Sequence, residues 1–123
     1  MDTNLVSVIT VVYNDVSHIE KTISNVLKQT YPFLEYIVVD GASTDGTLDV
    51  IKKYDGKLKY VSEPDKGIYD AMQKGAQLAS GEWILFRNCG DFFFSPDAIE
   101  KVFNGYVDKG EDFILCNSRY FQD

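Results

Sequence analysis

Short runs of β-branched and other apolar residues recur along this chain, separated by segments with helical periodicity. Residues 6–12 are almost continuously apolar, which is typical of a parallel strand buried on both faces of a sheet. We expect further strands at residues 36–40, 58–61, 83–86 and 113–116. Apolar residues spaced three or four apart predict a helix in each interval. This alternation predicts an α/β fold with a mostly parallel sheet and helices on both faces.

Capping signals indicate where three of these helices begin. Ser17 and Glu20 have the spacing of a capping box, so we expect the first helix to start beside them. Asp45 or its neighbour Thr44 is the expected cap of the second helix. Ser95 followed by proline predicts the N-cap and the first residue of the fourth helix.

Composition narrows the class of protein. The 123 residues suit a single domain spanning 1–123, with one core. Twelve Lys and Arg against 19 Asp and Glu give a net charge of −7, which disfavours nucleic acid as a partner. No apolar run approaches the roughly 20 residues of a membrane span, and Met1 is followed by no secretory signal pattern. Cys89 and Cys116 are too few for a disulfide framework, so we expect reduced thiols in a cytoplasmic protein.

Carboxylates follow the second and fourth predicted strands, at the sheet edge where such folds bind ligands. Asp40 precedes small residues and can accept a hydrogen bond from a base N–H or a ribose hydroxyl; alternatively, this segment is a structural turn. Asp91 closes the segment Asn88-Cys89-Gly90-Asp91, which suits Mg²⁺ or Mn²⁺ shared with ligand phosphates. The alternative for Asp91 is a loop residue that accepts backbone N–H bonds.

A third segment, after the strand at 58–61, carries Lys66 and Asp70 one helical turn apart. An ion pair between them is the simplest interpretation, and contact between Lys66 and a base or a phosphate is the other. His18 is the only histidine and is expected to be a solvated residue of the first helical turn. The glycine fingerprints of dinucleotide-binding folds and of the P-loop are absent from the sequence.

Four segments together resemble the nucleotide-sugar-binding half of family-2 glycosyltransferases, which have the Rossmann-like GT-A fold. They are V-S-V-I-T-V-V-Y-N, Y-I-V-V-D-G-A-S-T-D-G-T, S-E-P-D-K-G-I-Y-D-A-M-Q-K-G and A-S-G-E-W-I-L-F-R-N-C-G-D. The resemblance runs from Val6 to at least Phe94. It implies metal-assisted, inverting transfer of a sugar from a nucleotide-diphosphate donor to an acceptor hydroxyl, in polysaccharide or glycan synthesis.

The same resemblance assigns roles to individual residues. Asp40 matches the aspartate that meets the base, and Lys66 lies in the loop that closes on the nucleotide. Asp91 matches the last acid of a D-x-D-type motif, which holds Mn²⁺ or Mg²⁺ on the diphosphate. Gly90 replaces the usual acid before it, so metal affinity without nucleotide should be weak. The expected substrate-binding residues are Thr10, Tyr13, Asn14, Asp40, Ser43, Lys66, Asp70 and Asn88.

Family members usually continue into an acceptor-side half that supplies the general base. Nothing after Asp91 matches that half, so we expect residues 1–123 to be a fragment without a catalytic base, inactive alone. The implied partners are a nucleotide-diphosphate sugar donor and a glycan or lipid-linked acceptor of unknown identity. Peripheral membrane association at the cytoplasmic face and a homodimer are further expectations. Two alternatives stay open: a nucleotide-sugar-binding module without transfer, and a receiver-type signalling domain.

Overall fold

The computed structural model describes residues 5–103 and 115–117, and its centre is a five-stranded sheet. The strands are β1 (Val6–Val12), β2 (Leu34–Asp40), β3 (Lys59–Ser62), β4 (Trp83–Phe86) and β5 (Leu115–Asn117). Their order is β3-β2-β1-β4-β5; the first four are parallel, and β5 pairs with β4 in the antiparallel direction. The mostly parallel sheet predicted from the sequence is therefore confirmed.

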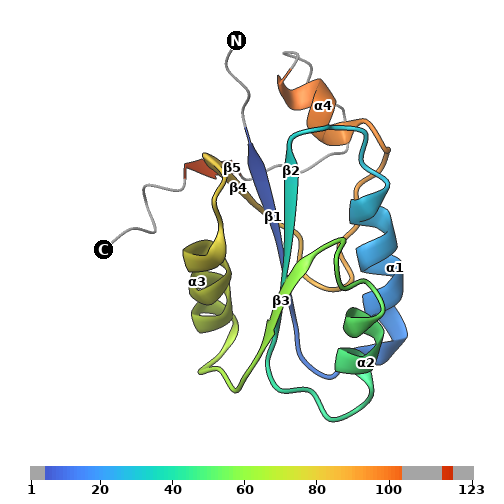
Figure 1. Cartoon of the computed structure of the whole chain (residues 1–123), viewed down its shortest axis with the longest axis vertical. Helices are drawn as coiled ribbons and strands as arrows, with labels where there is room; N and C mark the ends of the chain where they lie inside the picture. Colours follow the sequence, from blue (N-terminus) through green and yellow to red (C-terminus); the bar gives the residue numbers. More distant parts are fainter. Residues whose placement is uncertain (1–4, 104–114, 118–123) are drawn as a thin grey trace.

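Helices cover both faces of this sheet (Figure 1). They are α1 (Val16–Leu27), α2 (Thr47–Lys52), α3 (Ile68–Leu78) and α4 (Ala98–Phe103). Helix α3 lies on one face, and α1, α2 and α4 lie on the other (Figure 1). None of these four helices, within the described part of the chain, has the length and apolar character needed to cross a membrane.

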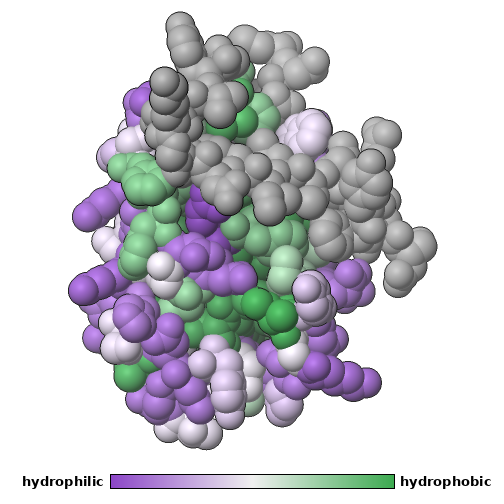
Figure 2. Space-filling view, turned by 180° about the vertical axis from the view of Figure 1, so that it is seen from behind, coloured by the Kyte–Doolittle hydropathy of each residue, from purple (hydrophilic) through white to green (hydrophobic). Residues whose placement is uncertain are grey.

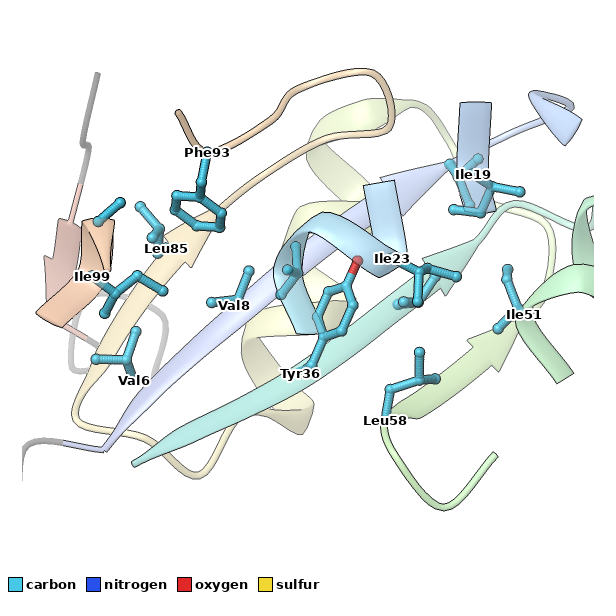
Figure 3. Packing of buried hydrophobic residues seen from close by; sticks show 14 residues of the cluster. Val6, Val8, Ile19, Ile23, Tyr36, Ile51, Leu58, Leu85, Phe93 and Ile99 are labelled. Atoms are coloured by element: carbon cyan, nitrogen blue, oxygen red, sulfur yellow. The ribbon is translucent and has the colours of Figure 1, made fainter. Parts of the chain in front are cut away.

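Strand β1 lies in the middle of the sheet and contributes to the core on both sides. Val6 and Val8 pack toward α1 and α4, whereas Ile9 and Val11 pack toward α3. Figure 3 shows the cluster of buried residues on the α1 side of the sheet, where Ile23 of α1 lies over the strands. Because successive side chains alternate between faces, a strand buried on both sides must be apolar almost throughout, as β1 is.

The starts of α1 and α4 differ from the expected positions. Helix α1 begins at Val16 with Asp15 in the N-cap position, so Ser17 lies inside the first turn and the predicted capping box is wrong. Helix α4 begins at Ala98, three residues after Ser95, whose carbonyl accepts a hydrogen bond from the Ala98 N–H at 3.3 Å. In both cases, turn residues that favour caps lie one or more residues away from the cap itself.

The strand order also decides against a receiver-type domain. Such domains have a parallel sheet of order 2-1-3-4-5. Here β1 lies between β2 and β4, and β5 is antiparallel. The receiver-type alternative is therefore wrong on topology alone.

Candidate functional site

A network of hydrogen bonds joins the loops that follow β1 and β2. The Asn14 N–H donates to Ser43 Oγ at 2.8 Å, and Asn14 Oδ1 accepts from the Thr44 N–H at 2.7 Å. Ser43 in turn donates to Asp40, from its hydroxyl at 2.5 Å and from its N–H at 3.0 Å. Asn14 and Ala42 have left-handed φ angles of 47° and 65°, which non-glycine residues seldom adopt. The network thus fixes an unusual backbone shape at this edge of the sheet.

Asp40 lies beneath that loop and not on its surface. Its relative exposure is 0%, and Oδ2 also accepts a hydrogen bond from Ser62 Oγ at 2.7 Å. The reason is its place in the sheet: Asp40 still belongs to β2, paired with Val12 of β1 and Ser62 of β3. From the sequence, the carboxylate of Asp40 was expected to face a base. In this structure that carboxylate has no exposed surface.

Thr10 is likewise internal. It is fully buried, and its Oγ1 forms a 2.8 Å hydrogen bond with the hydroxyl of Tyr36. Burial raises the pKa of Tyr36 above its ordinary value, so this hydroxyl stays protonated. Thr10 lies two residues before the end of β1, on the side that faces α1. The Thr10 side chain therefore supports the sheet from inside, and the nucleotide contact expected of Thr10 stays a prediction.

Asp45 holds the starts of two helices. Its Oδ1 accepts from the Thr47 N–H of α2 at 3.0 Å, and its Oδ2 accepts from the Val16 N–H of α1 at 3.1 Å. Gly46 occupies the N-cap position of α2, with φ 101°, so the predicted cap at Asp45 or Thr44 is wrong and the cap lies one residue after Asp45. Hydrogen bonds from Thr47 hold the pKa of Asp45 below its usual value, as expected of a carboxylate at helix N-termini.

A cavity of about 310 Å³ opens beside the end of β1 and the start of α3. Its lining residues are Val11, Val12, Tyr13, Asp65, Gly67, Ile68 and Ala71. Tyr13 is 64% exposed and Ile68 is 50% exposed, so large apolar side chains reach the surface here. Figure 2 shows the molecule from behind, and on that face hydrophobic surface lies between hydrophilic residues. An open, largely apolar cavity at a strand end suits a flat organic ligand.

Asp65 is the carboxylate in the wall of this cavity. A Cβ atom at Gly41 would lie 2.8 Å from Asp65 Oδ2 and 3.3 Å from Tyr13 Cδ1, so these two side chains converge on the glycine. The Gly67 N–H donates to Asp65 Oδ1 at 3.0 Å and orients the carboxylate. Sequence analysis did not single out Asp65. Its position in the turn after β3 is the feature of the sequence that could have pointed to it.

Lys66 and Asp70 meet through the backbone and not as an ion pair. The Lys66 N–H donates to Asp70 Oδ2 at 2.9 Å, and Lys74 Nζ lies 3.6 Å from the same oxygen. The Lys66 backbone hydrogen bond lowers the pKa of Asp70, which therefore stays ionised at the start of α3. The side chain of Lys66 is exposed next to the cavity-lining Gly67.

Asn88 and Asp91 follow β4, the strand beside β1. Asn88 Oδ1 is buried and has no hydrogen-bond partner among the described residues, whereas Asp91 is exposed. The loop is closed by a 2.9 Å hydrogen bond from the Asp91 N–H to the Asn88 carbonyl. Thr22 of α1 accepts from the Gly90 N–H at 3.0 Å and anchors the loop to the helix.

The loop after β4 supplies two oxygen-bearing side chains of the kind that hold divalent cations, Asn88 and Asp91. One carboxylate and one amide oxygen are oxygen donors of the kind that Mn²⁺ and Mg²⁺ accept, and an unpaired buried oxygen is costly without a partner. Within the described part of the chain, no three His, Cys, Asp or Glu side chains form a metal-binding group. Most of the coordination shell would therefore have to come from a ligand and from water.

Cys89 lies between the loops after β1 and β4. Burial raises the pKa of its thiol, and the neighbouring carboxylate of Asp15 raises it further, to about 12. Asp15 also lies 2.7 Å from the ring of His18, which holds the pKa of Asp15 below its usual value. His18 is exposed in the first turn of α1, as expected from the sequence. The raised pKa favours the neutral thiol over the reactive thiolate.

Comparison with known proteins gives a consistent match. A family model described as glycosyl transferase family 2 matches residues 7–123. An uncharacterized glycosyltransferase of Mycobacterium tuberculosis is 36% identical over 107 residues, which cover 85% of this chain and 41% of that protein. A PGL/p-HBAD biosynthesis glycosyltransferase of Mycobacterium bovis is 34% identical over 84 residues, 65% of this chain and 33% of that protein. The chain thus spans well under half the length of these relatives.

Solved structures share the fold. The mannosyltransferase PcManGT from Pyrobaculum calidifontis, in complex with GDP-Man and Mn²⁺, superposes with a TM-score of 0.75 at 28% identity; 85% of this chain and 32% of that chain are covered. S. aureus TarS 1-349 in complex with UDP-GlcNAc gives a TM-score of 0.73 at 27% identity, covering 81% of this chain and 30% of that chain. Both are similar to this chain over less than a third of their own length.

Proposed function

The chain belongs to glycosyl transferase family 2 and has the GT-A fold, and from this premise we propose that it is the donor-binding part of an inverting, metal-assisted glycosyltransferase. The observation that carries the proposal is the cavity beside Tyr13 at the end of β1, next to the strand that leads to Asp91. In α/β sheets ligands bind where the strand order changes direction, and here that point lies between β1 and β4.

In this proposal the nucleotide lies across the ends of β2, β1 and β4. The exposed ring of Tyr13 offers a face for the base. The exposed Lys66, which precedes the cavity-lining Gly67, is the residue that we assign to a phosphate. Asn14, Ser43 and Asp40 hold the loops that frame the site through their mutual hydrogen bonds. Asp70 contributes in the same indirect way, by fixing the backbone at Lys66.

The donor diphosphate would then lie toward Asn88 and Asp91, the residues suited to hold Mn²⁺ or Mg²⁺. A bound divalent cation supplies positive charge that stabilises the leaving diphosphate. With a single carboxylate in the pair, affinity for the metal alone should be weak and should rise when nucleotide phosphates complete the shell. That GDP-Man and Mn²⁺ occur together in a structural neighbour supports this arrangement.

The acceptor hydroxyl would attack the anomeric carbon as the bond to the diphosphate breaks, with inversion of configuration. We assign no residue of the chain as the general base that removes the hydroxyl proton. Relatives named for PGL/p-HBAD biosynthesis support a role in glycan or polysaccharide synthesis, which we place at the cytoplasmic face of a membrane. Dimerisation stays a prediction.

Calorimetric titration of UDP, GDP, dTDP and CMP into the purified chain, with and without Mn²⁺, tests the proposal. We expect one nucleoside diphosphate to bind, with an affinity that Mn²⁺ strengthens by about tenfold or more. Asp91→Ala should abolish the effect of Mn²⁺. Asp97→Ala is the matched control, because it removes a nearby carboxylate that already pairs with Lys101.

Failure of every nucleotide to bind would contradict the proposal. Binding that is unchanged by Mn²⁺ in the wild type would remove the metal-assisted part and leave the donor site. The alternative, a binding module without transfer, is tested in the intact-length protein. Release of the nucleoside diphosphate from a nucleotide sugar, dependent on an added glycan acceptor, would exclude that alternative.

A further inference from the structure

Two carboxylates lie near the cavity, and only one of them offers surface to a ligand. Asp40 is fully buried, and its two oxygens accept three hydrogen bonds from Ser43 and Ser62. Asp65 is partly exposed and lines the cavity itself. Its Oδ1 is used by the Gly67 N–H, while its Oδ2 accepts no hydrogen bond from the residues that the structure describes. Asp65 Oδ2 is therefore the available acceptor in the cavity wall.

The position of that oxygen depends on Gly41. Because the glycine has no side chain, Asp65 can lie over the loop after β2, with Oδ2 2.8 Å from where a Cβ would be. The ring of Tyr13 abuts the same point, 3.3 Å from it at Cδ1. A flat ring stacked on Tyr13 would thus lie close to the carboxylate.

We propose that Asp65 is the specificity-determining residue for the nucleobase, and that Oδ2 accepts a hydrogen bond from a ring N–H of a base stacked on Tyr13. A carboxylate without a proton is only an acceptor, so the base must present a donor. Uracil N3–H and guanine N1–H are such groups. The inference rests on the proposed function and adds to it both the residue and the chemical feature of the donor that is recognised.

Paired nucleotides that differ by one methyl group test this directly. UDP and its N3-methyl analogue, and GDP and its N1-methyl analogue, are titrated calorimetrically in Mn²⁺ into the wild-type chain. We expect methylation of the nucleotide that binds to weaken its affinity by about tenfold or more, because a hydrogen bond to a charged group is lost. A hydrogen bond that does not form in the wild type would leave the two affinities equal.

Asp65→Asn separates this hydrogen bond from the shape of the site. The amide oxygen should keep the Gly67 N–H, which places the NH₂ group where Oδ2 was and removes the acceptor. We expect the parent nucleotide to bind about tenfold more weakly to this variant, at an unchanged melting temperature. Gly41→Ala should have a similar effect, because the new Cβ displaces the carboxylate. Asp49→Asn, which makes the same charge change at an exposed site on α2, is the control.

The outcomes are distinguishable. Weaker binding of the methylated nucleotide by the wild type, with loss of parent affinity in Asp65→Asn and Gly41→Ala but not in Asp49→Asn, supports the inference. Tight binding of the parent nucleotide that neither methylation nor Asp65→Asn alters would overturn it and leave the proposed function intact. Absence of any nucleotide binding by the wild type would overturn both.

Discussion

Ser43 donates to both carboxylate oxygens of Asp40, from its hydroxyl to Oδ1 at 2.5 Å and from its N–H to Oδ2 at 3.0 Å. The same hydroxyl accepts the Asn14 N–H, so one serine links the last residue of β2 to the loop after β1. Since Ser62 of β3 also donates to Asp40, a single buried carboxylate holds three segments together. Asp40 is therefore expected to act on any ligand through the loop that it supports.

Asp40→Ala should lower the free energy of unfolding by about 2–4 kcal/mol, because the partly buried donors of Ser43 and Ser62 lose their buried acceptor. Urea denaturation at pH 7 measures the loss. Asp49→Ala, which removes an exposed carboxylate, should cost less than about 1 kcal/mol. Equal effects of the two substitutions would show that the Asp40 network contributes nothing special to stability.

Much of the fold could be predicted because its strands are buried on both faces. The expected bounds of β1 and β4 coincide with the structure, since an apolar run has clear ends. The antiparallel direction of β5 was not specified, because such a run carries no information on direction. The predicted strand at 113–116 is found at Leu115–Asn117, and residues 113–114 lie outside the described residues.

The site was predictable only in outline. Asp91 and Asn88 were predicted because they follow a buried strand, where such sheets bind ligands, and their roles stay predictions. The burial of the Thr10 side chain was not predicted, because it depends on Tyr36, 26 residues away in sequence. Asp65 was not singled out, because the role that we propose for it depends on the space above Gly41, which only the packed loops define.

Glu35, which lies near the start of β2, should stabilise the folded state in a pH-dependent way. Burial alone would raise its pKa, but hydrogen bonds from Lys59, Ser80 and Ser7 outweigh this and lower the pKa from 4.5 to about 2. A carboxylate with a depressed pKa stabilises the folded state above its unfolded pKa. Its contribution is lost as the pH falls from about 4.5 toward 2.

Glu35→Gln should therefore lower the free energy of unfolding by about 2 kcal/mol at pH 7. The difference from wild type should shrink as the pH falls below about 4.5. Urea midpoints measured at pH 7, 4 and 3 check both statements. Glu82→Gln removes an exposed carboxylate and should leave the midpoint nearly unchanged. A Glu35→Gln difference that stayed constant with pH would contradict the assignment.

Gly75 lets α3 approach the sheet closely. A Cβ at this position would lie 2.5 Å from Ile9 Cγ2 and 3.2 Å from Val39 Cγ2. Alanine would add about 1 kcal/mol of helix propensity, but overpacking typically costs about 1–3 kcal/mol. We expect Gly75→Ala to be destabilising by about 1 kcal/mol on balance in thermal and urea unfolding.

Combining Gly75→Ala with Ile9→Ala tests the cause of that loss. Ile9→Ala alone should cost about 2–5 kcal/mol by leaving a cavity. The double variant should be more stable than the sum of the two losses predicts, because the new methyl group occupies the vacated space. Additive losses would show that the clash with Ile9 is not what limits position 75.

Cys89 should be slow to alkylate in the folded protein. Burial and the carboxylate of Asp15 raise the pKa of its thiol from 9.0 to about 12, and only the thiolate reacts. In a Cys116→Ser background, which leaves one thiol, iodoacetamide at pH 8 should label the folded chain about a hundredfold or more slowly than the urea-unfolded chain.

Asp15→Asn removes the negative charge beside Cys89, so labelling of the folded variant should accelerate by about tenfold. Asp45→Asn, which changes a carboxylate at the neighbouring helix start, serves as the control for general loosening of α1. Equal acceleration by both substitutions would mean that access, and not the Asp15 charge, keeps the thiol unreactive.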